Sequence, residues 1–121
     1  MNMNTSIRQV GGVAVVDIRG RIELGKGGAA LREVVCGLLK KGHKKILLNL
    51  HDVYYIDSMG LGTLVSIFTD VRNQQGELKL LNLTNKISGL MQVTRLYTVF
   101  DIMNDEAKAV RSFSQTTAAS V

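Results

Sequence analysis

Tyr55-Ile56-Asp57-Ser58-Met59-Gly60-Leu61-Gly62-Thr63 joins an apolar segment to an amphipathic one. Upstream, residues 45–50 form an almost continuous apolar run of strand length, as is typical of a central strand covered on both faces. Downstream, apolar residues recur at helical spacing from Leu61 to Val71 and form one stripe. The sequence therefore predicts a buried strand followed by a helix. Ser58 is expected at the N-cap, where its hydroxyl can accept a backbone N–H.

Two glycines stand in what should be the first turn of this helix. Each of Gly60 and Gly62 weakens a helix by roughly 0.5–1 kcal/mol relative to alanine. Bare backbone at these positions would let a ligand or another protein approach Ser58 closely. The alternative is that Ser58 is only a helix cap, since serine is among the preferred capping residues.

Elsewhere in the chain, strand patterns alternate with helix patterns. Gly11-Gly12 suits a tight hairpin turn between two short strands, and from Ala29 onward the alternation implies crossover connections. We therefore predict an α/β fold with a mixed sheet. The expected strands are 7–10, 13–18, 45–50, 77–83 and 99–102. The first two expected helices are 29–41 and the one after Ser58, which should end with Gly76 at C′. The third is capped by Thr84 or Asn85 and carries Ile87, Leu90 and Met91. The fourth begins with residues 104–106, and its apolar stripe is Ala107, Val110 and Phe113.

Length and composition indicate one domain, 1–121, with residues 114–121 as a frayed tail. Hydrophobic residues make up 45% and aromatic residues only 5%, so the core must be mainly aliphatic. Cys36 is the single cysteine and lies on an apolar helix pattern, which favours a reduced structural residue. Neither a signal-peptide pattern nor a run of about 20 apolar residues is found, so we expect a cytoplasmic protein.

Basic residues raise the question of an anionic ligand. The formal net charge is +5, and residues 40–45 form the densest positive run. Nucleic acid is the alternative partner that such a run suggests. These lysines fall where a helix should end and where cations complement the helix dipole, and no aromatic residues interleave with them to stack bases, so we expect no direct binding of nucleic acid. Gly25-Lys26-Gly27-Gly28 could cradle a phosphate, but its spacing fits no known phosphate-binding loop and favours a flexible loop. His43 and His51 have no partner ligands at metal spacing.

The segment Asp57-Ser58-x-Gly60-Leu61-Gly62, directly after an apolar strand, resembles the signature of the STAS domain. The likeness is closest to the small bacterial anti-sigma factor antagonists, in which the serine after the aspartate is phosphorylated. This resemblance implies that Ser58 is the phosphorylated residue and that Glu23 lies near it. It also implies a four- to five-stranded sheet with about four helices. Met59 departs from the family, which commonly has a second small hydroxyl residue there.

The resemblance implies a switchable binding module and no enzyme or cofactor. The unphosphorylated chain would bind an anti-sigma factor with a serine-kinase fold and free the sigma factor. That partner would phosphorylate Ser58 with ATP and Mg²⁺, which ends the association, and a PP2C-type phosphatase would restore it. The residues expected to bind the partner are Glu23, Asp57, Met59, Gly60, Gly62 and Thr63.

Two other functions are compatible with the sequence. The chain could be the STAS subunit of a transporter or another signalling complex, docking through the serine loop without phosphorylation. A hydrolase is the enzymatic alternative, because a serine on a strand-to-helix turn is typical of a nucleophile elbow. Ile56 stands where that motif needs glycine, and His51, expected at the same end of the strand, is the histidine that could approach Ser58.

Overall fold

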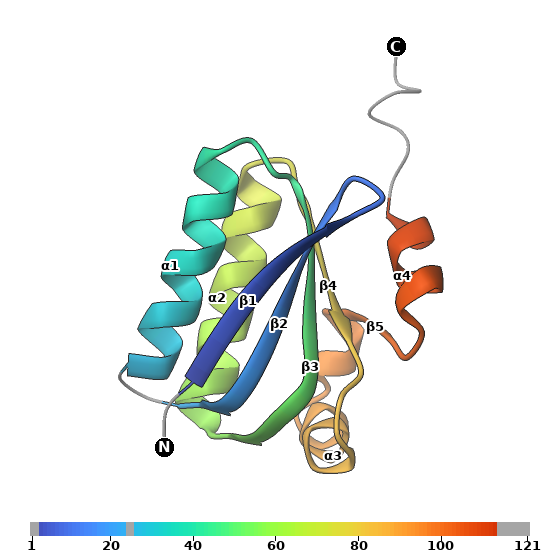
Figure 1. The fold of residues 1–121 in the computed structure, drawn as a ribbon. Helices are drawn as coiled ribbons and strands as arrows, with labels where there is room; N and C mark the ends of the chain where they lie inside the picture. Colours follow the sequence, from blue (N-terminus) through green and yellow to red (C-terminus); the bar gives the residue numbers. More distant parts are fainter. Residues whose placement is uncertain (1–2, 24–25, 114–121) are drawn as a thin grey trace.

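The computed structural model describes residues 3–23 and 26–113, and within them helices cover both faces of a five-stranded sheet (Figure 1). The elements in chain order are β1 (Met3–Val10), β2 (Val13–Ile22), α1 (Lys26–Lys40), β3 (Lys45–Ile56), α2 (Ser58–Asn73), β4 (Glu77–Leu81), α3 (Asn85–Val93), the 3-10 helix η1 (Leu96–Thr98), β5 (Asp101–Met103) and α4 (Glu106–Ser112). The predicted fold class is confirmed. The expected frayed tail, 114–121, lies outside the described residues, as does Gly25 of the proposed phosphate loop.

The sheet follows chain order, β1-β2-β3-β4-β5, so the predicted central strand is indeed the middle one. β1 runs antiparallel to β2 through Gly11 and Gly12, whose φ angles of 54° and 80° suit a tight hairpin turn. The remaining strands pair in parallel, which makes the sheet mixed as predicted. Both hairpin strands are longer than the predicted 7–10 and 13–18.

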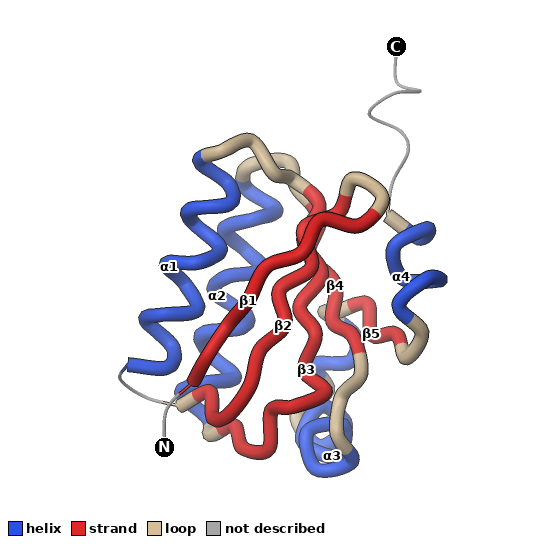
Figure 2. The backbone as a smooth tube through the Cα atoms, viewed as in Figure 1, coloured by secondary structure: helices blue, strands red, loops and turns tan. Residues whose placement is uncertain are grey.

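Each face of the sheet has its own hydrophobic core. α1 and α2 lie side by side on one face, and their apolar stripes pack with α3 onto inward residues of β2, β3 and β4 (Figures 1 and 2). Strand side chains alternate between faces, so neighbouring residues point to the opposite side, where α4 covers them. This second cluster is smaller and consists of Val13, Val15, Leu47, Leu81, Ala109 and Phe113. α4 therefore covers only part of its face.

The end of α2 differs from the prediction. The left-handed residue after the helix is Gln75, with φ of 64°, and not Gly76. Gly76 has another reason to be glycine, because a Cβ there would lie 2.7 Å from the carbonyl oxygen of Lys44. That oxygen accepts the backbone N–H of Glu77 at 2.7 Å as β4 begins, so the chain must pass close to it.

Other element ends also shift. α1 begins three residues before the predicted Ala29, and β4 ends before Asn82, whose φ of 59° breaks the strand. β5 starts at Asp101 instead of residue 99 because Val99 and Phe100 close η1, with the backbone N–H of each donating to the carbonyl of Leu96. Thr84, not Asn85, is the N-cap of α3 and accepts the N–H of Ile87 at 3.4 Å. In α4 the buried residue is Ala109, and the predicted Ala107 is exposed.

Arg8 links α4 to the sheet through hydrogen bonds to two carboxylates. Its Nε and Nη2 donate to Asp17 on β2 at 2.6 and 2.9 Å, and its Nη1 and Nη2 donate to Glu106 on α4 at 3.1 and 2.8 Å. Asn49 of β3 adds a bond to Asp17 at 2.8 Å. The Arg8 hydrogen bonds lower the pKa of Glu106 and, with a smaller contribution from Asn49, that of Asp17.

This network predicts a loss of stability in acid that depends on Arg8. The pKa values of both carboxyls are lower in the folded chain than their ordinary values, which are 3.8 for Asp17 and 4.5 for Glu106. Their contribution to the free energy of unfolding is therefore present above the ordinary values, and it is lost as the pH falls through the lower pKa values of the folded chain. Urea unfolding between pH 7 and pH 3 should show a stability difference between wild type and Arg8→Met that shrinks in acid. Glu33→Gln, on exposed α1 surface, is the matched control. A difference independent of pH would contradict the prediction.

Candidate functional site

Ser58 is the first residue of α2 and is exposed, and the N-cap is Asp57 instead of the predicted Ser58. Asp57 has extended backbone, and its Oδ1 accepts the N–H of Gly60 at 2.7 Å. Its carbonyl accepts the N–H of Leu61 at 2.9 Å. The carboxylate therefore satisfies a backbone donor that the Ser58 hydroxyl was expected to satisfy. The sequence-only reading of Ser58 as a cap is wrong.

Gly60 is buried, and the structure gives it a different reason from the predicted one. A Cβ at this position would overlap the carbonyl oxygen of Ile22 and lie 2.8 Å from its carbonyl carbon. The same oxygen accepts the N–H of Asp57 at 3.4 Å. Gly60 thus lets the first turn of α2 pack directly on the end of β2. Its lack of a side chain serves internal packing, which fixes where Ser58 is presented.

The other predicted residues of the helix start face outward to different degrees. Gly62 is exposed, and a Cβ there would meet no atom within 4 Å, so internal packing does not require glycine. Met59 is 55% exposed, which is high for a large apolar side chain. Thr63 is half-buried, and its Oγ1 donates to the carbonyl of Met59 at 3.1 Å. Ser58, Met59 and Gly62 are therefore the accessible residues at the start of α2.

Glu23 directly follows Ile22, on which the first turn of α2 packs, so its backbone lies at the same end of β2. Its carbonyl accepts the N–H of Gly28 at 3.2 Å, and its side chain is half-buried. Arg21 donates from Nε and Nη2 to Glu23 Oε1 at 3.3 and 3.1 Å, which raises the pKa of Arg21. The carboxylate expected to meet a partner is thus already paired with a cation.

Two glycines also allow the start of α1 to pack against the end of β2 and the start of α2. A Cβ at Gly27 would lie 2.9 Å from the carbonyl oxygen of Arg21, and one at Gly28 would lie 3.0 Å from Thr63 Oγ1. These two residues belong to a helix and not to the flexible loop that was predicted. The starts of α1 and α2 therefore converge on the end of β2.

Two irregularities in β3 were not visible in the sequence. The register pairs Asp17 with Asn49 but Arg19 with Asp52, and then Gly20 with Val53 but Arg21 with Tyr55. β3 therefore contains an extra residue in each interval, as in a β-bulge. The polar pair after Leu50 interrupts the apolar run in the sequence, but a break in polarity does not by itself predict a change of register.

His51 does not lie at the strand end, as the hydrolase alternative required. β3 continues to Ile56, and the His51 Nδ1 contacts Asp52 Oδ1 at 3.0 Å on exposed surface. The expectation that His51 and Ser58 share one end of the strand is wrong. Within residues 3–23 and 26–113, no group of three His, Cys, Asp or Glu side chains is placed to hold a metal ion.

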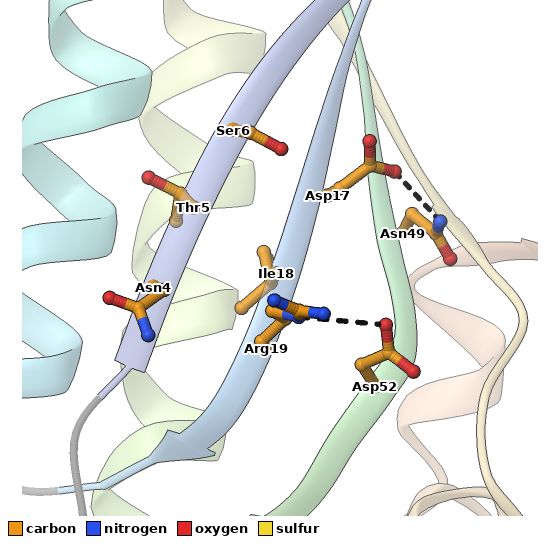
Figure 3. Close-up of a pocket in the computed structure, with 8 residues that line it drawn as sticks. All are labelled: Asn4, Thr5, Ser6, Asp17, Ile18, Arg19, Asn49 and Asp52. Carbon is orange, nitrogen blue, oxygen red and sulfur yellow. Dashed lines mark hydrogen bonds and ion pairs between the residues drawn. The ribbon is translucent and has the colours of Figure 1, made fainter.

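A polar groove of about 440 Å³ lies over β1, β2 and β3 (Figure 3), and Ser58 is not among the residues that line it. Its floor includes Asp17 and Asn49, which are bonded to each other, while Arg19 and Asp52 approach to 3.9 Å across it. Its lining residues are Asn4, Thr5, Ser6, Asp17, Ile18, Arg19, Asn49 and Asp52. The charged side chains in this groove thus already have partners, Arg19 and Asp52 in each other and Asp17 in Arg8 and Asn49.

The lysine run of residues 40–45 lies at the opposite end of α2 from Ser58. Lys40 is in the last turn of α1, as expected, and Lys44 Nζ donates to the carbonyl of Gln74 at 2.9 Å. Cys36 is half-buried on α1. In the part of the chain that the structure describes, no helix has the length and apolar character needed to cross a membrane.

Comparison with known proteins identifies the family. Residues 4–109 match the STAS domain, so the chain belongs to the STAS domain family. It is 36% identical over 102 residues to the anti-sigma-B factor antagonist of Bacillus subtilis, covering 84% of this chain and 92% of that protein.

Solved structures share the fold. The crystal structure of a putative anti-sigma factor antagonist from Thermotoga maritima matches with a TM-score of 0.82 at 24% identity, covering 90% of this chain and 93% of that one. The anti-sigma factor antagonist SpoIIAA in its unphosphorylated form matches with a TM-score of 0.66 at 17% identity, covering 89% of this chain and 96% of that one. Its phosphorylated form matches with a TM-score of 0.68 at 16% identity, covering 89% and 97%.

Proposed function

We propose that this chain is an anti-sigma factor antagonist of the cytoplasm, whose unphosphorylated form binds an anti-sigma factor with a serine-kinase fold and thereby frees the sigma factor. The observation that carries the proposal is the exposed Ser58 on the first turn of α2. The Asp57 cap and the packing of Gly60 on Ile22 hold that turn in place. The name of the Bacillus subtilis relative supports the same role.

Phosphorylation of Ser58 switches the association off. The Ser58 oxygen attacks the γ-phosphorus of ATP bound with Mg²⁺ in the partner, the bond to ADP breaks, and the hydroxyl proton passes to a base of the kinase. A PP2C-type phosphatase later hydrolyses the phosphoserine. SpoIIAA, which shares this fold, is known in unphosphorylated and phosphorylated forms, and this supports a switch of the same kind.

The docking surface consists of Ser58 and the residues that surround it. Met59 and Gly62 offer accessible apolar and backbone surface, while Glu23, Asp57 and Thr63 form its polar part. Gly60 supports the surface from below and is not itself open to a partner. The chain acts as substrate and ligand of the kinase and not as a catalyst.

Reconstitution with the purified components tests this function. Each anti-sigma factor of serine-kinase fold from the same organism is mixed with its sigma factor, the chain and radiolabelled ATP with Mg²⁺. We expect one of them to release its sigma factor and to label wild type but not Ser58→Ala. Thr69→Ala, an exposed hydroxyl on α2 remote from its start, should be labelled like wild type. Binding without labelling would favour the docking subunit of another complex, and labelling of Ser58→Ala would refute Ser58 as the acceptor.

A further inference from the structure

Tyr54 is the extra residue of the second irregularity in β3. Gly20 pairs with Val53 and Arg21 pairs with Tyr55, so Tyr54 has no partner in the β2 register. It is 53% exposed, whereas Val53 before it and Ile56 after it are buried in the core. The extra residue keeps both core positions and turns one aromatic side chain outward, as bulges beside functional sites do.

Residues next to Tyr54 in β3 and opposite it in β2 fix the backbone at this position. The Arg21 guanidinium lies 4.4 Å from the centre of the Tyr55 ring and is also bound to Glu23. Gly20 adopts φ of 103°, a conformation that glycine tolerates, where the two strands come back into register. A side chain with two rotatable bonds on such a strand loses little conformational entropy when a partner covers it.

Tyr54 is also close to the proposed docking surface along the chain. It lies near the end of β3, four residues before Ser58, and Met59, similarly exposed, follows Ser58 directly. Arg21 of β2 and Glu23, which follows that strand, are paired with each other at 3.1 Å. Ser58 is therefore flanked along the chain by two large exposed side chains, Tyr54 and Met59, while the Arg21 and Glu23 charges are already paired.

Resting on the proposed function, we propose that Tyr54 is a specificity-determining anchor that inserts into an apolar pocket of the anti-sigma factor beside the site that receives Ser58. Tyrosine is enriched among the few residues that dominate protein–protein affinity, and these lie in desolvated pockets. The pocket is apolar because the aromatic ring supplies the contact and the neighbouring charges are already paired. Phenylalanine at position 54 should therefore bind the partner as well as tyrosine does.

The experiment compares Tyr54→Ala and Tyr54→Phe with wild type against the anti-sigma factor found by reconstitution. Tyr97→Ala is the matched control, because this tyrosine is 51% exposed but lies on η1. Binding is measured by calorimetry and Ser58 phosphorylation by initial rates. We expect Tyr54→Ala to weaken binding about tenfold or more and to raise KM without lowering kcat. Tyr54→Phe and Tyr97→Ala should stay within about threefold of wild type.

The outcomes separate this inference from the function on which it rests. Wild type that binds and is phosphorylated while Tyr54→Ala does both equally well would overturn the anchor and leave the function standing. Equal losses in Tyr54→Ala and Tyr97→Ala would also overturn it, because the loss would not belong to this site. If wild type binds no anti-sigma factor of the panel, the function fails and the anchor fails with it. Thermal unfolding of each variant checks that the fold is intact.

Discussion

Ser58→Asp is expected to weaken binding of the anti-sigma factor roughly a hundredfold, whereas Ser58→Ala is expected to retain it. Docking covers the first turn of α2, where Ser58 is exposed in the free chain. A charge forced into a covered interface loses hydration worth several kcal/mol unless the partner supplies a matching cation. A penalty of about 3 kcal/mol corresponds to the hundredfold loss.

Neighbouring groups increase this penalty. The Asp57 carboxylate already caps the helix through the Gly60 N–H, so a second anion at Ser58 faces a like charge instead of an unoccupied cap. A kinase site also holds nucleotide phosphates and an acidic base near the accepting hydroxyl. Phosphoserine, with about −1.5 to −2 charges, should weaken binding at least as much as aspartate.

Titration of the anti-sigma factor with wild type, both variants and fully phosphorylated chain measures this effect. Thr69→Asp is the matched control, because it places the same charge on an exposed position of α2 remote from Ser58. Far-UV spectra and thermal unfolding should show that the phosphorylated chain stays folded, since phosphate at a helix N-terminus meets a favourable dipole. Tight binding by the fully phosphorylated chain would refute the switch.

Gly60→Ala is expected to destabilise the chain by about 2–3 kcal/mol, while Gly62→Ala should stabilise it by about 0.5–1 kcal/mol. Both positions lie among the first five residues of α2, so helix propensity alone favours alanine at each. At Gly60 the new methyl group would overlap the carbonyl oxygen of Ile22 and push α2 away from β2. At Gly62 it would enter open space.

Urea unfolding of the two variants measures the difference directly. The cost at Gly60 is a large fraction of the stability of a domain of this size, which is typically 5–15 kcal/mol. A Gly62→Leu variant should keep its fold but bind the anti-sigma factor more weakly, because the larger side chain stands on the docking surface. Equal stability changes at Gly60 and Gly62 would contradict the packing described here.

The order of elements and several of their ends were determined by the sequence alone. Gly11-Gly12 made the hairpin turn, residues 45–50 made the central strand, and Asp105 opened the last helix by accepting the N–H of Lys108 at 2.9 Å. Each of these three features depends on residues close together in the chain, so local propensity and periodicity were sufficient to predict it. The signature around Ser58 pointed to the candidate site by its resemblance to a known family and not by periodicity.

The tertiary structure decided what depends on residues distant in the chain. Gly60 must be glycine because of the Ile22 carbonyl, and Gly76 because of that of Lys44. The irregularities of β3, which turn Tyr54 outward, exist only in its register with β2. Asp57, and not Ser58, is the N-cap because packing on β2 fixes where the helix starts. Steric overlap and strand register are properties of pairs of segments, so no pattern within one segment could predict them.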